Sequence, residues 1–100
     1  MKTITEISQL DGRVYVHLAT QELALQFLRQ AEEEGFTFRD GAKPTSRGAT
    51  EVMAVNADRT INYVGFAGHI AYQSGAKAVG QRRLIKVEFD PFMDAIAMSV

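Results

Sequence analysis

With 100 residues, 46% of them hydrophobic, the chain can bury one modest core and is too short for two. It has no cysteine, which excludes disulfides and thiolate metal sites, and no stretch near the roughly 18 apolar residues of a membrane span, which excludes a membrane helix. Its net charge of −1 argues against a strong general nucleic-acid binder. We therefore expect one cytoplasmic domain over residues 1–100, in which residues 91–100 form a frayed tail.

The first half of the chain predicts a strand, a helix and a second strand. Residues 13–18 alternate apolar and polar side chains, which is the periodicity of a β-strand. Residues 20–35 predict the main helix, because apolar side chains recur at spacings of three and four between Thr20, a suitable N-cap, and Gly35, a suitable stop. A short strand over 36–38 follows.

The second half predicts a hairpin, a short helix and a last strand. Residues 51–65 read as two strands joined by a polar turn at 56–59. Residues 66–75 predict a short helix that a glycine ends, and residues 82–89 alternate as a strand does. A terminal helical turn is expected from Asp90, which is followed by a proline suited to the first helical position.

This order predicts an α+β fold, a two-layer sandwich with a mainly antiparallel sheet and with the main helix and the short helix on one face. Tyr15, His17 and Asn62 would then point to the opposite face, open to water or to a partner.

Charge is unevenly distributed along the chain. Residues 1–35 carry three basic and six acidic residues, whereas residues 36–86 carry eight basic and three acidic residues. The remainder carries three acids and no base. A basic middle between acidic ends can create a local positive face, and a solvated surface of mixed charge is the other interpretation.

The segment "FRDGAKPTSRG", residues 38–48, places three cations between two apolar segments. It does not fit a phosphate-binding P-loop, because Lys43 is followed by Pro44 and no helix pattern comes after it. Two interpretations stay open. In the first, Arg39, Lys43 and Arg47 contact phosphates or carboxylates. In the second, the segment is a plain connector.

No catalytic or metal motif is present. The two histidines lack the spacing of a metal site, and no serine lies in a nucleophile elbow. The sequence therefore predicts a protein that is not an enzyme and takes no cofactor or metal. Glu32, Glu33 and Glu34 lie at a helix end where the macrodipole disfavours negative charge, so they form either an interaction surface or a tolerated solvent-exposed run.

Most of the chain resembles a group of small proteins carried by phages and conjugative elements of Gram-positive bacteria. The resemblance lies in the stretches "VYVHLATQELALQFLRQAEEEGFTF", "DGAKPT", "VMAVNADRTINYVGFAGHIAY" and "RLIKVEF". Some proteins of this pool are anti-CRISPR proteins of type II-A systems, and the chain is similar to those in size and layout. The resemblance implies an inhibitor, in the cytoplasm of a bacterial host cell, that binds the CRISPR effector nuclease, its guide RNA or both.

Such an inhibitor would block assembly of the nuclease or its engagement of DNA, either by filling its basic channel with acids or by competing for RNA with cations. An accessory nucleic-acid-binding protein of a mobile element is the alternative, with Tyr15 or Tyr63 available for stacking. The candidate binding residues form a cationic and an acidic group: Arg39, Lys43, Arg47, Arg82 and Arg83, and Glu32, Glu33 and Glu34.

Overall fold

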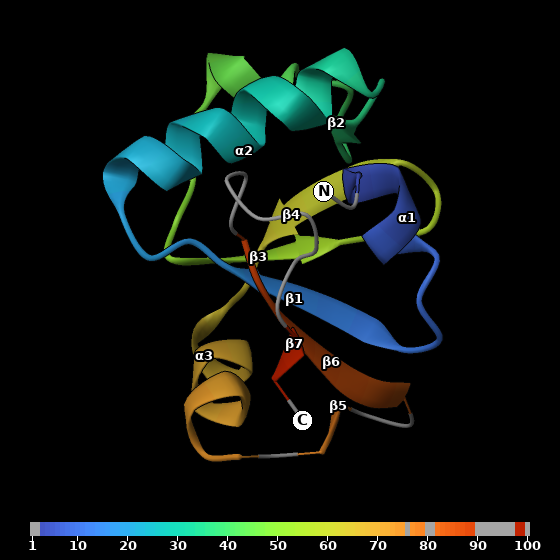
Figure 1. The fold of residues 1–100 in the computed structure, drawn as a ribbon, viewed down its shortest axis with the longest axis vertical. Coiled ribbons are helices and arrows are strands. Elements are labelled where there is room, and N and C mark those ends of the chain that lie inside the picture. The colour runs from blue at the N-terminus through green and yellow to red at the C-terminus, as the bar shows by residue number, and fades with distance from the viewer. Residues whose placement is uncertain (1–2, 76, 80–81, 90–97, 100) are drawn as a thin grey trace.

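The computed structural model describes residues 3–75, 77–79, 82–89 and 98–99, which contain three α-helices, one short 3-10 helix and seven strands (Figure 1). In chain order the elements are α1 (Ile4–Ser8), β1 (Arg13–His17), α2 (Gln21–Glu33), β2 (Thr37–Phe38), η1 (Pro44–Ser46), β3 (Val52–Val55), β4 (Thr60–Tyr63), α3 (Phe66–Gln73), β5 (Ala78–Val79), β6 (Arg82–Glu88) and β7 (Met98–Ser99).

The strands form one mixed sheet in the order β2–β4–β3–β1–β6–β5, and β7 also pairs with β6. β1 is central, antiparallel to β3 and parallel to β6, so that Val14 lies between Val55 and Ile85. β2 and β4 are parallel, whereas β3 and β4 form the expected antiparallel hairpin. The α+β class is confirmed, and the sheet contains both antiparallel and parallel pairs.

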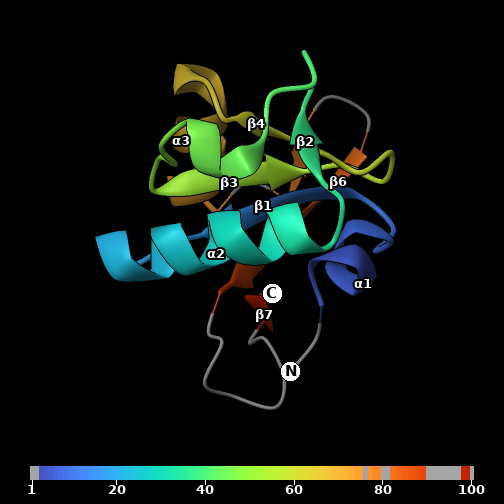
Figure 2. The same cartoon turned by 90° about the horizontal axis from the view of Figure 1, so that it is seen from above.

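The larger core lies between the sheet and helices α1 and α2 (Figure 2). Phe27 of α2 is fully buried and meets Phe89 edge to face, with ring centroids 5.6 Å apart. The two helices contribute Ile4, Ile7, Phe27, Leu28 and Ala31 to this core. Burial of one apolar stripe of α2 is what its spacing of three and four residues predicts.

Helix α3 covers the opposite face of the sheet (Figure 2), so the prediction that both helices share one face is wrong. Beneath α3 lies a smaller core of Tyr15, Val52, Ala54, Val64 and Leu84. All four residues of β3 are buried, which is the pattern of a strand that is covered on both faces. The face of the sheet that was predicted to be open to water is therefore largely covered by α3.

Local signals at the helix ends agree with the structure. The Thr20 hydroxyl accepts a hydrogen bond from the Leu23 N–H at 3.1 Å, and Gly35 follows α2 with a φ of +86°. The predicted strands and the short helix are confirmed within a few residues, and the polar turn from Asn56 to Arg59 closes the hairpin. The helical turn expected from Asp90 lies outside the described residues.

Candidate functional site

The segment 39–48 is an ordered loop that packs beside α2. The Glu32 carboxylate at the end of α2 accepts hydrogen bonds from the Thr45 N–H at 3.2 Å and from the Thr45 hydroxyl at 2.7 Å. At the other end of the loop, the Phe38 N–H, which points away from β4, donates to the Ala42 carbonyl at 2.9 Å. The loop thereby blunts the edge of the sheet and holds its cations on a fixed backbone.

Arg47 and Tyr63 rest on the same buried ring. The Arg47 guanidinium lies 5.0 Å from the centroid of Phe38, and the Tyr63 ring lies 5.4 Å from it. Arg47 also pairs with Asp40 at 2.5 Å, and this hydrogen bond is the main reason why the pKa of Asp40 is lowered. The Tyr63 hydroxyl donates to the Gly48 carbonyl at 2.7 Å, while 44% of the residue stays exposed. Arg47 therefore supports the loop in addition to carrying charge.

Lys43 and Arg39 are exposed on the same loop, and neither forms an ion pair with any residue that the structure describes. Hydrogen bonds from Thr45 lower the pKa of Glu32, and the charge of Lys43 adds a smaller effect in the same direction. We call Arg39, Lys43, Arg47 and Tyr63 the loop surface. It combines three cations with an exposed aromatic ring.

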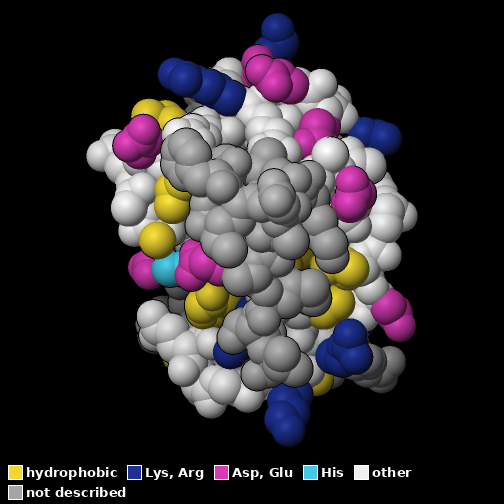
Figure 3. Space-filling view, in the orientation of Figure 1, with side chains coloured by type: hydrophobic (Ala, Val, Ile, Leu, Met, Phe, Trp, Pro, Cys, Tyr) yellow, Lys and Arg dark blue, Asp and Glu magenta, His cyan; other side chains and the backbone are white. Residues whose placement is uncertain are grey.

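Arg82 and Arg83 lie elsewhere, at the beginning of β6. Strands β4, β3 and β1 separate β6 from β2, so these two strands lie about 19 Å apart across the sheet. Figure 3 shows basic side chains at the two opposite ends of the face in view. Arg82 donates to the Gly12 carbonyl at 2.7 Å. The predicted cationic group is thus divided into two separate surfaces.

The predicted acidic group is largely occupied by internal contacts. Glu34 is half-buried and accepts hydrogen bonds from the Ile4 N–H at 3.1 Å and from the Thr5 N–H at 2.8 Å, so it caps α1 from across the fold. Burial acts to raise the pKa of Glu34, but these hydrogen bonds outweigh it and the pKa is lowered. Glu32 holds the loop, and Glu33 is exposed.

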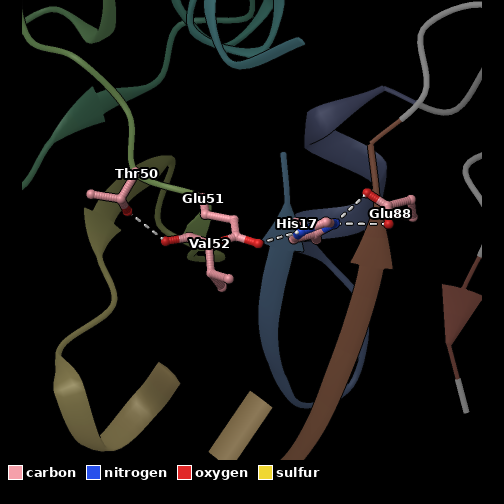
Figure 4. A network of polar contacts seen from close by, with 5 residues as sticks. All are labelled: His17, Thr50, Glu51, Val52 and Glu88. Atoms are coloured by element: carbon pink, nitrogen blue, oxygen red, sulfur yellow. Dashed lines mark hydrogen bonds and ion pairs between the residues drawn. The ribbon is translucent and has the colours of Figure 1, made fainter. Parts of the chain in front are cut away.

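A second cluster lies on the α3 side of the sheet, around His17 (Figure 4). The Nδ1 atom of His17 lies 2.7 Å from a carboxylate oxygen of Glu88, and its Nε2 atom lies 3.0 Å from Glu51. The ring also stacks on Tyr72 of α3, with centroids 5.8 Å apart. We call these four residues the histidine cluster. The sequence predicted His17 on the face opposite α2, but it left that face open to water, and the carboxylates come from residues 34 and 71 positions away and carried no local signal.

The histidine cluster does not have the geometry of a catalytic base, because both ring nitrogens are occupied by carboxylates and neither is left for a substrate. Tyr15, expected as an exposed stacking residue, is only 4% exposed under α3 and cannot stack on a base. Within residues 3–75, 77–79, 82–89 and 98–99, no group of three or more His, Asp or Glu side chains is placed to hold a metal ion. None of the helices described is long and apolar enough to cross a membrane.

Comparison of the chain with protein-family models, curated proteins and solved structures gives no match.

Proposed function

We propose that this chain is a non-enzymatic inhibitor of a type II CRISPR effector nuclease, and that it acts by binding the guide RNA through the loop surface. The observation that carries the proposal is an ordered loop on which cations stand beside an exposed aromatic ring, with Arg47 and Tyr63 both resting on Phe38. Arginine and lysine bind phosphates, and a tyrosine ring stacks on unpaired bases. Occupying the guide RNA would block its loading or its engagement of DNA.

The distribution of charge supports binding of the guide RNA by cations over filling of the nuclease channel by acids. An inhibitor that fills the basic channel of a nuclease needs carboxylates that are free to contact it. Glu32 and Glu34 instead accept hydrogen bonds that hold the loop and α1, which leaves Glu33 as the acid of that run without such a role in the part of the chain that the structure describes. Arg39 and Lys43, in contrast, are exposed.

The same surface also suits a second function, that of an accessory nucleic-acid-binding protein of a mobile element. Phosphate contacts and base stacking on Tyr63 do not depend on a nuclease. The two functions differ in what the chain affects: an inhibitor prevents cleavage by the nuclease, whereas an accessory protein binds single strands and leaves cleavage unchanged.

The first experiment combines a pull-down with a cleavage assay. The purified chain is incubated with a type II effector nuclease, with and without guide RNA, and capture and DNA cleavage are measured. We expect RNA-dependent capture and loss of cleavage. Capture that is equally strong without RNA would contradict binding through the guide RNA, and unchanged cleavage at saturating chain would contradict inhibition.

The second experiment tests the loop surface by fluorescence anisotropy with labelled guide RNA at two salt concentrations. The double variant Arg39→Glu/Lys43→Glu leaves the supporting residue Arg47 in place, and Arg82→Glu/Arg83→Glu makes the same charge change at the other end of the sheet. We expect only the first variant to bind weakly, and its affinity to depend less on salt, by about 1.4 in the logarithmic slope if two phosphate contacts are lost. Equal weakening by both variants would show that the loop has no special role.

The aromatic part of the loop surface has its own control. Tyr63→Ala removes the exposed ring, and we expect RNA affinity to fall about tenfold, within the range of one base stacking on an aromatic side chain. Tyr63→Phe keeps the ring and removes the hydrogen bond to Gly48, so it should bind as the wild type does. A weaker Tyr63→Phe variant would assign the effect to the shape of the loop and not to stacking.

A further inference from the structure

The contacts of His17 define its charge. A neutral imidazole carries one N–H and can donate a hydrogen bond from one nitrogen only. Both nitrogens of His17 lie within hydrogen-bond distance of a carboxylate, from Glu88 on one side and Glu51 on the other (Figure 4). With both carboxylates ionised, only the doubly protonated ring satisfies both contacts. The arrangement is therefore that of an imidazolium held between two acids.

This imidazolium lies against the end of α3. Tyr72 is in the last turn of the helix, and its ring stacks on His17 with an angle of 24° between the planes. Lys86 of β6 donates to the Tyr72 carbonyl at 2.5 Å, and its ammonium lies 5.0 Å from the same ring. Cations stabilise both a helix C-terminus and an aromatic face. Protonated His17 and Lys86 thus favour the same docked position of α3.

Among the side chains that the structure describes, five buried residues form the core beneath α3, whereas sixteen form the core on the other face of the sheet. The stacking of His17 on Tyr72 and the hydrogen bond from Lys86 to the Tyr72 carbonyl add to this apolar core in docking α3.

We propose that His17 is a pH-dependent latch, which in its protonated form fixes α3 and the beginning of β3 to the centre of the sheet and in its neutral form loosens α3. On deprotonation one carboxylate faces a nitrogen lone pair, and Glu51 is the one to turn away, because its side chain is 64% exposed against 46% for Glu88. The sheet itself stays paired through the backbone hydrogen bonds on either side of His17. The latch is independent of the loop surface and of the proposed RNA contact.

The groups around the ring set the direction of its titration. Burial acts to lower the pKa of His17, but hydrogen bonds and charge interactions with Glu51 and Glu88 outweigh it, so the pKa is raised. Tyr72 faces the ring with its aromatic surface, and the ammonium of Lys86 on β6 lies 5.0 Å from the centroid of that Tyr72 ring. A raised pKa in the folded state means that the latch contributes fully below the ordinary histidine pKa of about 6.5 and is lost as the pH rises through the folded value.

The test is amide hydrogen exchange at about pH 5.5 and about pH 8.5, which lie below and above the ordinary histidine pKa. The measured exchange rates are corrected for the intrinsic rate at each pH. We expect the protection of α3 in the wild type to fall by about two- to fivefold at the higher pH, the range that a cation at a helix C-terminus supplies. The protection of α2 serves as the internal reference and should not change. Loss of protection that is equal in α2 and α3 would overturn the proposal.

Two variants complete the test. His17→Gln removes the titrating ring and should show low protection of α3 at both pH values, whereas His69→Gln removes the other histidine and should behave as the wild type does. If His17→Gln does not fold, Glu51→Gln keeps the hydrogen-bond acceptor without its charge and should shift the transition to lower pH. A pH response of α3 that survives in His17→Gln, or is absent from the wild type, would overturn the latch.

Discussion

Replacing Glu34 by alanine tests whether the acidic run at the end of α2 is structural. The carboxylate accepts hydrogen bonds from the Ile4 and Thr5 N–H groups, which are donors at the beginning of α1 with no partner inside that helix, and from the Thr5 hydroxyl at 2.7 Å. Its loss leaves α1 without this cap, although Thr3 still accepts from the Glu6 N–H.

The expected cost follows from these contacts. Loss of a helix cap costs about 0.5–2 kcal/mol. Because Glu34 accepts hydrogen bonds from two backbone N–H groups, the cost of losing it should lie near the upper end of that range. Removing a negative charge from the C-terminus of α2 returns about 0.5 kcal/mol. We therefore expect Glu34→Ala to lower the free energy of unfolding by about 1.5 kcal/mol, and the melting temperature of a chain of this size by about 6–12 °C.

Urea denaturation at neutral pH measures this difference, and Glu33→Ala is the matched control because Glu33 is the exposed neighbour in the same run. The pKa of Glu34 is lowered by its hydrogen bonds, so its contribution is present above the ordinary carboxyl pKa of about 4.3 and is lost as the pH falls through the folded value. The difference between wild type and Glu34→Ala should therefore shrink in acid. Equal midpoints for Glu33→Ala and Glu34→Ala at neutral pH would refute the capping role.

Three further predictions concern the core, helix α3 and metals. Phe27→Ala should lower the free energy of unfolding by about 3–5 kcal/mol, because it leaves a cavity beside Phe89 in the larger core; an unchanged urea midpoint would contradict this packing. Gly68→Ala, which in an open helix would stabilise by about 1 kcal/mol, should here lower the melting temperature, because the new methyl group would clash with Val64 and crowd the Tyr15 hydroxyl; a higher melting temperature would show that α3 has room to shift. A chelator such as EDTA should leave the melting temperature unchanged, and a fall of several degrees would reveal a metal site.

Most of the regular elements could be predicted from the sequence because their signals are local. The helix over α2 follows from apolar residues at spacings of three and four and from the cap at Thr20. Helix α1 was not predicted, although Thr3 and Glu6 have the spacing of a capping box and Ile4 and Ile7 share one face. The sequence therefore contains a local signal for α1.

The faces of the sheet were harder to predict. Alternation along β1 separates Val14 and Val16 from Tyr15, but it does not say whether the second face meets water or a helix. The four consecutive apolar residues of β3 were the available sign that both faces are covered. The parallel pairing of β1 with β6 has no local signal, because it joins segments about 70 residues apart.

For the charged residues too, some properties follow from the sequence and others only from the tertiary structure. The sequence by itself determined which side chains carry charge and that Arg39, Lys43 and Arg47 lie in a polar loop. Only the tertiary structure decided that Glu34 caps α1 and that His17 lies between two carboxylates. Hydrogen bonds and ion pairs act over a few ångströms in space, and these partners come together only when the sheet and its helices pack, so no pattern of neighbouring residues contains them.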